Sequence, residues 1–320
     1  MKKRKIFIAH RGACGYLPEH TLPGKAMAYA MDPDFLEQDV VLTRDNRPIV
    51  VHDIFLDTVS DVAQLFPQRK RKDGRYYAID FTLKEIKELS LHERIDIGTG
   101  KAVYPGRFPE KAVTHFEIPL LEEEVELILG LNKSTGRDIG VYTELKAPAF
   151  HNREGKKIED IVLDALKQYG YASRDSNCYI QCFEPASIIY MREKLKSDLK
   201  MVQLIGDNSW EDSLGVDYDR MMTPPGLDEV ARYADGIGPW MDQIVANENR
   251  NKPRFTGLVE LSHARNMDVH PYTFRYDSLP PYAESFDDLL DIFFLKAGVD
   301  GIFTDFPDKA RDFLKKKGFR

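Results

Sequence analysis

Short apolar segments alternate with segments of helical periodicity along almost the whole chain, and this alternation is the feature that most restricts the fold. Apolar runs typical of strands occupy residues 6–12, 35–43, 140–146 and 177–183. Between the last two, residues 158–170 (IEDIVLDALKQYG) carry apolar side chains at helical spacing and end in glycine. Strand and helix repeat about eight times along the chain, which is the pattern of a (β/α)8 barrel.

The remaining segments continue this pattern. The predicted strands are residues 6–12, 35–43, 47–53, 140–146, 177–183, 200–206, 234–240, 267–274 and 301–307. The predicted helices are residues 23–31, 81–91, 121–132, 158–170, 185–196, 256–266 and 285–298. The turn signal Arg44-Asp45-Asn46 joins two of the strands into a hairpin. A doubly wound sheet usually has a GxGxxG loop after its first strand, and this chain has none there. We therefore expect an α/β fold, a TIM barrel that spans residues 1–320 as one domain.

Residues 54–117 interrupt the alternation. This segment contains the basic run 68–72 (QRKRK), the tyrosines Tyr76 and Tyr77, and the loop-like sequence YPGRFP at 104–109. We interpret it as an insertion after the second strand region that lies over the barrel mouth, rather than as a separate fold.

The composition excludes several classes of partner. The net charge of −7 argues against a broad nucleic-acid-binding surface, and no run approaches the roughly 18 apolar residues of a membrane span. The start MKKRK resembles the basic part of a signal peptide, but only the apolar residues 6–9 follow it. We expect either a periplasmic or otherwise exported protein in its mature form, or a cytoplasmic one. The oligomeric state is open, with a homodimer as one option. Cys14, Cys178 and Cys182 are expected to be unpaired packing residues.

Polar and aromatic residues gather where the predicted strands end. In a TIM barrel the working side chains lie at the carboxyl ends of the strands. The residues in such positions are His10, Arg11, Glu37, Asp39, His52, Glu144, Lys146, Gln181, Trp240, Tyr272 and Phe274.

Strand geometry predicts a metal site among them. Residues i and i+2 of a strand share a face, so Glu37 lies on the same side as Asp39, and Glu144 on the same side as Lys146. Taken alone, Glu37 and Asp39 fit a solvated strand face better, and Glu144 and Lys146 fit a cross-paired surface dyad better. However, apolar residues flank both strands, and buried strands do not leave carboxylates unpaired. Three converging carboxylates need a counter-charge, and an all-oxygen ligand set selects Ca²⁺ or Mg²⁺.

Two histidines and two cations flank the same position. His10 and His52 can divide the work of base and acid near neutral pH, and Arg11 and Lys146 offer positive charge to a phosphate. The aromatic residues Phe150, Trp240, Tyr272 and Phe274 fit a substrate wall or the core equally well. Other histidines are expected to be structural or on the surface, although His20 and His151 fall near the predicted mouth.

The combination of these motifs resembles a known family. Seven segments are similar to the glycerophosphodiester phosphodiesterases, and most similar to their bacterial periplasmic (GlpQ-type) branch. They are HRGACGYLPEHT, FLEQDVVLTRDNRPIVVHD, YTELKAPAFH, YIQCF, YADGIGPW, VHPYTFR and GIFTDFPDKA. The likeness runs from residue 6 to about residue 314 and includes part of the insertion, KDGRYYAIDFTLKEIK. The wider family often has asparagine where this chain has His20, and serine where it has Cys14.

The resemblance implies a TIM barrel that hydrolyses glycerophosphodiesters to sn-glycerol 3-phosphate and an alcohol. Carried over position by position, it implies these roles: His10 and His52 as the acid–base pair; Glu37, Asp39 and Glu144 as ligands of a metal, Ca²⁺ in this branch with Mg²⁺ as an alternative; and Arg11 and Lys146 on the phosphate. Gln181 and the four aromatic residues are further candidates for substrate binding.

Two other functions compete with this one. The same superfamily contains phosphodiesterases that act like phospholipase D on lysophospholipid or sphingomyelin. A surface adhesin built on the same barrel is the alternative outside enzymology.

Overall fold

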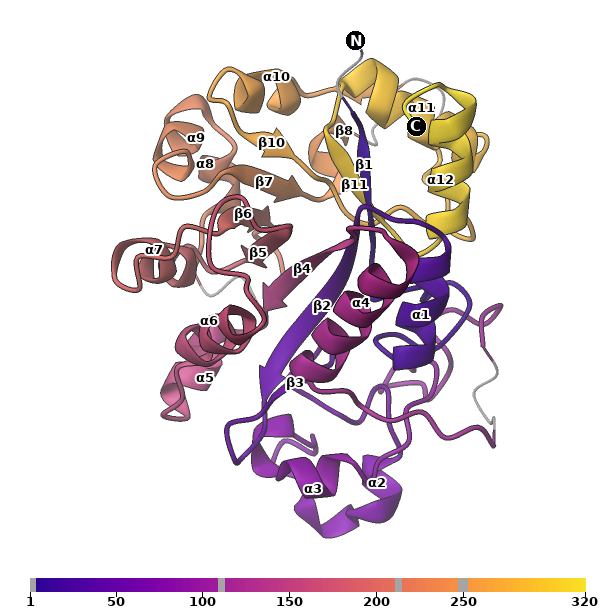
Figure 1. The fold of residues 1–320 in the computed structure, drawn as a ribbon, viewed down its shortest axis with the longest axis vertical. Coiled ribbons are helices and arrows are strands. Elements are labelled where there is room, and N and C mark those ends of the chain that lie inside the picture. The colour runs from indigo at the N-terminus through magenta and orange to yellow at the C-terminus, as the bar shows by residue number, and fades with distance from the viewer. Residues whose placement is uncertain (1–3, 109–112, 211–214, 247–252) are drawn as a thin grey trace.

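The computed structural model describes residues 4–108, 113–210, 215–246 and 253–320. Within them, eight parallel strands form the barrel in the order β11-β1-β2-β4-β5-β6-β7-β10 (Figure 1). Their bounds are β1 Ile6–Ala9, β2 Phe35–Leu42, β4 Gly140–Leu145, β5 Cys178–Cys182, β6 Lys200–Ile205, β7 Gly236–Pro239, β10 Asp268–Val269 and β11 Gly301–Thr304. A short antiparallel pair, β8 (Val245–Ala246) and β9 (Arg254–Phe255), lies outside the barrel sheet.

The barrel is nearly closed, although β10 and β11 form no regular ladder. Single backbone hydrogen bonds close the gap: Asp300, just before β11, donates to Val269 of β10 (3.1 Å), and Phe303 of β11 donates to Pro271, just after β10 (3.0 Å). The predicted strand 267–274 is therefore regular only over its first part. The predicted fold class, a (β/α)8 barrel, is confirmed.

The second strand region forms the predicted hairpin. β2 pairs with β3 (Pro48–Val50) in antiparallel register, with Val40 opposite Val50. On its other side β2 runs parallel to β4, and this register places Asp39 directly opposite Glu144. Because β3 runs antiparallel to β2, the N–H of Val51 reaches the carbonyl of Asp39 (2.9 Å), and residues 52 and 53 follow beside the part of β2 that carries Asp39.

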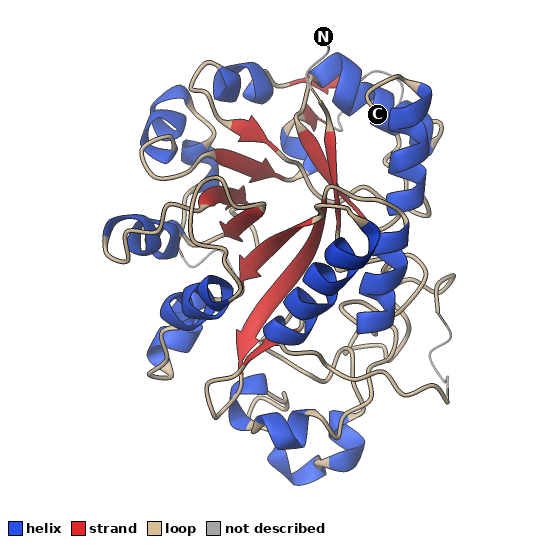
Figure 2. Ribbon diagram, in the orientation of Figure 1, coloured by secondary structure: helices blue, strands red, loops and turns tan. Residues whose placement is uncertain are grey.

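Helices surround the strands on the outside of the barrel (Figure 2). They are α1 Leu22–Ala30, α4 Leu121–Thr135, α5 Pro148–Arg153, α6 Ile158–Gln168, α7 Pro185–Glu193, α8 Tyr218–Met221, α9 Pro224–Val230, α10 Leu258–His263, α11 Phe286–Asp291 with a π-helical extension Ile292–Ala297, and α12 Pro307–Lys316. In α6, for example, Ile158, Val162 and Leu166 are buried at spacings of four residues, as an amphipathic helix requires. None of the described helices is long and apolar enough to cross a membrane.

Aromatic side chains fill the amino-terminal half of the barrel interior. Tyr142 stacks on Tyr179 with ring centroids 4.8 Å apart, and it meets Phe303 edge to face. Together with Ile8, Phe35 and Val202 these residues form one buried cluster. This half of the interior is packed, and among the described residues a cavity opens at the carboxyl ends of the strands.

The insertion lies beyond the carboxyl end of β2 (Figure 1). It contains α2 Val62–Leu65, α3 Leu83–Ile86 and two 3₁₀ turns, Pro67–Arg69 and Ala78–Asp80. The predicted helix 81–91 is thus a single turn, with a capping box between Thr82 and Glu85. The insertion packs into one buried cluster with Val41 and Ile49 of the hairpin, so it is attached to the barrel through β2 and β3. Residues 109–112 of the predicted insertion lie outside the described residues.

His151 connects α5 to the barrel as a buried neutral ring. Its Nε2 accepts the backbone N–H of Leu42 (3.1 Å), and its Nδ1 donates to the carbonyl of Ala147 (3.0 Å). Burial lowers the pKa of His151 from its ordinary value to about 4. The structural role expected for this histidine is consistent with these contacts.

This ring predicts a loss of stability in acid. A histidine whose pKa is lower in the folded than in the unfolded state contributes stability above about pH 6.5, and this contribution disappears as the pH falls toward 4. We expect His151→Gln to remove a pH-dependent contribution on the order of 3 kcal/mol between pH 7 and pH 4. Urea unfolding of both proteins at several pH values measures it. Parallel stability curves for the two proteins would contradict this assignment.

Candidate active site

A cavity of about 570 Å³ opens at the carboxyl ends of the barrel strands. Ten of the twelve residues predicted for the site line it: His10, Arg11, Glu37, His52, Glu144, Lys146, Phe150, Gln181, Trp240 and Tyr272. Of the other two, Asp39 lies in the carboxylate cluster described below, and Phe274 lies elsewhere.

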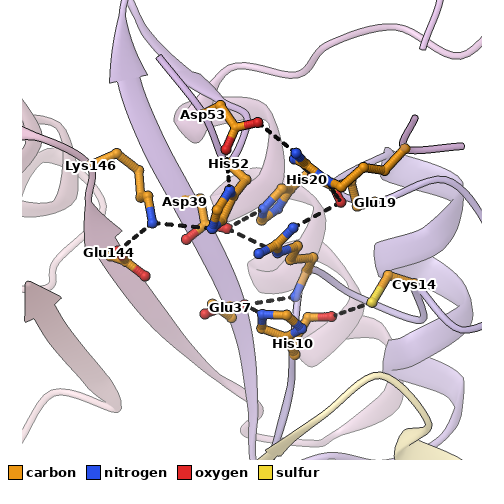
Figure 3. A network of polar contacts seen from close by, with 12 residues as sticks. His10, Cys14, Glu19, His20, Glu37, Asp39, His52, Asp53, Glu144 and Lys146 are labelled. Atoms are coloured by element: carbon orange, nitrogen blue, oxygen red, sulfur yellow. Dashed lines mark hydrogen bonds and ion pairs between the residues drawn. The ribbon is translucent and has the colours of Figure 1, made fainter. Parts of the chain in front are cut away.

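The three predicted carboxylates meet at one point. Oxygen atoms of Glu37, Asp39 and Glu144 lie within 4.8 Å of one another, and all three residues are buried (Figure 3). The backbone N–H of Arg11 donates to Oε2 of Glu37 (2.7 Å), and Nε2 of Gln181 donates to Oε1 (3.0 Å).

Each of the other two carboxylates has a nitrogen partner. Nε2 of His20 lies 2.7 Å from Oδ2 of Asp39, a contact that sequence reasoning missed, and Nζ of Lys146 lies 2.6 Å from Oε1 of Glu144. Oδ1 of Asp39 is buried and makes no hydrogen bond within the described part of the chain.

The pKa values of the three acids indicate that too little positive charge lies beside this cluster. Burial and then the neighbouring Asp39 and Glu144 raise the pKa of Glu37 well above its usual value. Burial also raises the pKa of Glu144 to about 7 despite the nearby Lys146. Asp39 differs, because Lys146 and His20 overcome the effect of burial and keep its pKa low. The cluster thus offers three carboxylates with too little positive charge beside them, and Oδ1 of Asp39 makes no hydrogen bond within the described residues. This set of oxygen ligands fits a divalent cation such as Ca²⁺ or Mg²⁺.

His10 is oriented by a carboxylate from the other end of the chain. Its Nδ1 lies 2.6 Å from Oδ1 of Asp305, which follows β11, and its Nε2 lies 3.9 Å from Glu37. Sequence reasoning missed Asp305, although its position directly after a barrel strand is the same signal that identified the other residues. A carboxylate beside Nδ1 favours the tautomer that carries the proton on Nδ1. Nε2, which faces the cavity, is then unprotonated.

His52 has the same arrangement. Its Nδ1 lies 2.5 Å from Oδ1 of Asp53, and its Nε2 lies 3.3 Å from Nζ of Lys146 (Figure 3). Burial, and then the guanidinium of Arg11, lowers the pKa of His10 and of His52 to about 4. Both rings are therefore neutral at pH 7 before a ligand binds, which suits a proton acceptor.

Arg11 has an unusual backbone conformation. Its φ is 54°, in the left-handed region, and Gly12 follows at 88°. A non-glycine residue pays a small energetic penalty there, and such residues cluster at functional sites. This turn points the Arg11 amide at Glu37 while the guanidinium reaches Glu19 (2.9 Å). The sequence HRG thus supplies a side chain and a backbone donor to the site.

Aromatic side chains form part of the cavity wall. Phe150 stacks on Tyr77 of the insertion (5.4 Å), Trp240 lies 5.9 Å from Trp210, and the hydroxyl of Tyr272 donates to a backbone carbonyl of β6. Sequence reasoning missed further lining residues, namely Ile54, Phe55, Tyr77, Phe183, Trp210 and Arg275. Most of them come from the insertion or from loops, where periodicity carries no signal.

Phe274 was predicted for the cavity, and the structure places it in the core. Its ring lies 4.8 Å from that of Phe293 in α11's extension and is fully buried. Phe274 was named because it lies at the end of the predicted strand 267–274, although the core was an equal alternative. The regular strand β10 ends at Val269, and Phe274 lies beyond it in an isolated bridge to Thr304 of β11.

Comparison with known proteins identifies the family. Residues 10–309 match the profile of the glycerophosphoryl diester phosphodiesterase family. The chain belongs to this family. A glycerophosphodiester phosphodiesterase of Haemophilus influenzae is 45% identical, with 98% of this chain and 91% of the relative covered, and one of Treponema pallidum is 37% identical, with 98% and 92% covered. The predicted enzyme class is confirmed.

Solved structures of phosphodiesterases have the same fold. A phosphodiesterase of this family from Silicibacter pomeroyi superposes with a TM-score of 0.75 at 25% identity, covering 99% of this chain and 95% of that one. A phosphodiesterase of Oleispira antarctica, determined with sn-glycerol-3-phosphate, superposes with a TM-score of 0.63 at 18% identity, covering 98% and 97%. The narrower assignment to the periplasmic branch of the family stays a prediction.

The carboxylate cluster predicts stabilisation by divalent cations. An ion present at about 100 times its Kd raises the free energy of unfolding by roughly 2.7 kcal/mol. We expect Ca²⁺ or Mg²⁺ to raise the thermal midpoint of chelator-treated protein, and Glu37→Gln to abolish that rise. Asp312→Asn, at an exposed acid of α12, is the matched control and should keep the full response. An equal response from both variants would contradict a metal site at Glu37.

Proposed function

We propose that this enzyme hydrolyses glycerophosphodiesters to sn-glycerol 3-phosphate and an alcohol, with a divalent cation, most simply Ca²⁺, held by Glu37, Asp39 and Glu144. One observation carries the proposal: a cluster of three buried carboxylates shares its cavity with two histidines, each oriented by an aspartate. The phosphodiesterase of Oleispira antarctica was determined with the product sn-glycerol-3-phosphate, which supports the same product here.

The phosphate would bind between the carboxylate cluster and the two cationic side chains. When bound, the cation would offset negative charge on the phosphoryl oxygens as the transition state forms. Arg11 and Lys146 both line the cavity and add fixed positive charge there. Because Glu19 already holds the guanidinium of Arg11, little reorganisation is needed when the phosphate arrives.

The histidines would move the protons. One neutral ring takes a proton through Nε2 from the attacking hydroxyl, which is water or the glycerol 2-hydroxyl of the substrate. In the second case a cyclic phosphate forms and water then opens it, with the benefit of intramolecular proximity. The other histidine protonates the leaving alcohol. The negative phosphodiester favours protonation of a nearby imidazole, so substrate binding itself prepares the acid.

A single assay tests substrate and metal together. Release of glycerol 3-phosphate from glycerophosphocholine is measured before chelation, after chelation, and after adding back Ca²⁺ or Mg²⁺. We expect activity to disappear with the chelator and to return with one of the two ions. Lysophosphatidylcholine in a parallel assay tests the lysophospholipase D-like alternative, and faster choline release from it would replace our proposal. Full activity in excess chelator would exclude the metal.

The acid–base roles predict large losses of turnover. Replacing His10 or His52 by alanine should lower kcat by roughly 10² to 10⁴-fold, the range typical of acid–base groups, while the fold persists. His115→Ala, at an exposed position, is the control and should turn over normally. A near-normal kcat for either cavity variant removes that histidine from the mechanism.

We also propose an exported, periplasmic location. The resemblance to the periplasmic branch of the family supports it. Fractionation of cells that produce the protein from its complete gene tests it, and recovery only with cytoplasmic markers would reject it.

A further inference from the structure

The two aspartates behind the histidines are themselves held by arginines, and both arginines come from the insertion. Asp53 and Asp305 each use one oxygen for a histidine. The other oxygen of each accepts hydrogen bonds from a guanidinium, of Arg94 or of Arg107 respectively. The insertion therefore reaches both histidines through one intervening carboxylate.

Arg94 bridges two carboxylates at the mouth. Its Nη1 lies 2.6 Å from Oδ2 of Asp53, its Nη2 lies 2.6 Å from Oε1 of Glu19, and its Nε lies 3.0 Å from Oε2. Glu19 in turn accepts from Arg11. One guanidinium, whose side chain is only 14% exposed, is thus linked both to His52 and to the proposed phosphate ligand Arg11.

Arg107 occupies the corresponding place behind His10. Its Nη2 lies 2.7 Å from Oδ2 of Asp305, its Nη1 donates to the carbonyl of Cys14 (3.2 Å), and its Nε binds Asp277 (2.9 Å). The side chain is 3% exposed. Arg275 of the barrel shares the same oxygen of Asp305 (2.9 Å), so Asp305 has two cationic partners.

We propose that the insertion positions both histidines for catalysis, with Arg94 acting on His52 through Asp53 and Arg107 acting on His10 through Asp305. This inference rests on the acid–base roles proposed above. Neither arginine touches the reacting atoms; both are positioning residues.

The physical reason is the torsional freedom of an aspartate side chain. An aspartate bonded to an imidazole through one oxygen can still rotate and swing about its side-chain torsions. A charge-assisted hydrogen bond to its second oxygen removes that freedom and keeps the carboxylate ionised. In metal sites, a carboxylate bonded to a histidine fixes the tautomer and the orientation of the ring, and its loss typically costs 10- to 100-fold in activity or metal affinity. We expect loss of the arginine that holds such a carboxylate to stay within that range.

The two arginines predict different kinetic changes. Arg107→Gln should lower kcat by about 10-fold with KM unchanged, because Arg275 still holds Asp305. Arg94→Gln should lower kcat by up to about 100-fold and also raise KM, because it releases Glu19 and with it Arg11. Arg69→Gln is the matched control, since Arg69 pairs with Glu85 inside the insertion (2.7 Å); it should keep the wild-type kcat.

Double variants separate positioning from general stability. If Arg94 acts through Asp53, Arg94→Gln should lower kcat much less in an Asp53→Asn protein than in the wild type, and the same holds for Arg107→Gln combined with Asp305→Asn. Arg94→Lys should recover part of the loss, since one ammonium can reach one of the two carboxylates. Multiplicative losses within these pairs, or a kcat loss in Arg69→Gln equal to that in Arg94→Gln, would overturn the proposal.

A measurement without turnover keeps this inference separate from the proposed reaction. Nitrogen-15 NMR of labelled histidine reports which ring nitrogen carries the proton. We expect His10 and His52 to be protonated on Nδ1 in the wild type, and each signal to move toward a mixture of tautomers in Arg107→Gln and Arg94→Gln respectively. Unchanged histidine signals in both variants would refute positioning even in an active enzyme. Altered signals in a protein that does not cleave glycerophosphocholine would instead reject the proposed substrate alone.

Discussion

The meeting of three carboxylates in the barrel mouth is the constraint on which the rest of the site depends. Buried acids at such short distances repel one another, and burial further disfavours their ionised forms. One cation and two neutral hydrogen-bonding groups offset this repulsion: the ammonium of Lys146 beside Glu144, the ring of His20 beside Asp39, and the backbone N–H of Arg11 at Glu37. The pKa of Glu37 remains raised nonetheless, so the protein by itself does not neutralise the cluster. A bound cation would complete it.

The surrounding fold serves to keep these acids in place. Aromatic side chains fill the amino-terminal half of the barrel interior, so the acid side chains have no space to turn in that direction. Behind β2, the buried ammonium of Lys25 binds the backbone carbonyl of Glu37 and pairs with Glu124 of α4 (2.8 Å). A buried ion pair of this kind contributes little net stability, but it fixes geometry. Here it fixes the strand that carries two of the three acids.

The insertion connects the barrel with the mouth of the cavity. It lines the cavity through Phe55 and Tyr77, and it reaches the aspartates behind both histidines. It also shares a buried cluster with the β2–β3 hairpin, so its position depends on the same strands that carry the acids. Catalytic geometry and substrate wall are thereby linked through one segment of chain.

The sequence by itself determined the barrel and most of the cavity, because both follow from local rules. Alternation of apolar strands and amphipathic helices specifies the (β/α)8 pattern, and the two-residue period of a strand places Glu37 and Asp39 on one face. Where that period fails, the prediction fails too: β10 ends at Val269, and Phe274 belongs to the core.

Only the tertiary structure decided which groups hold the site together. Asp305 meets His10 across 295 positions of sequence, and Arg107 meets Asp305 across 198. No periodicity encodes such contacts, because they exist only once the last strand closes against the first and the insertion packs on the hairpin. The positions of strand ends in the sequence predict which side chains reach the mouth. The hydrogen-bond partners of those side chains are determined only when the barrel closes.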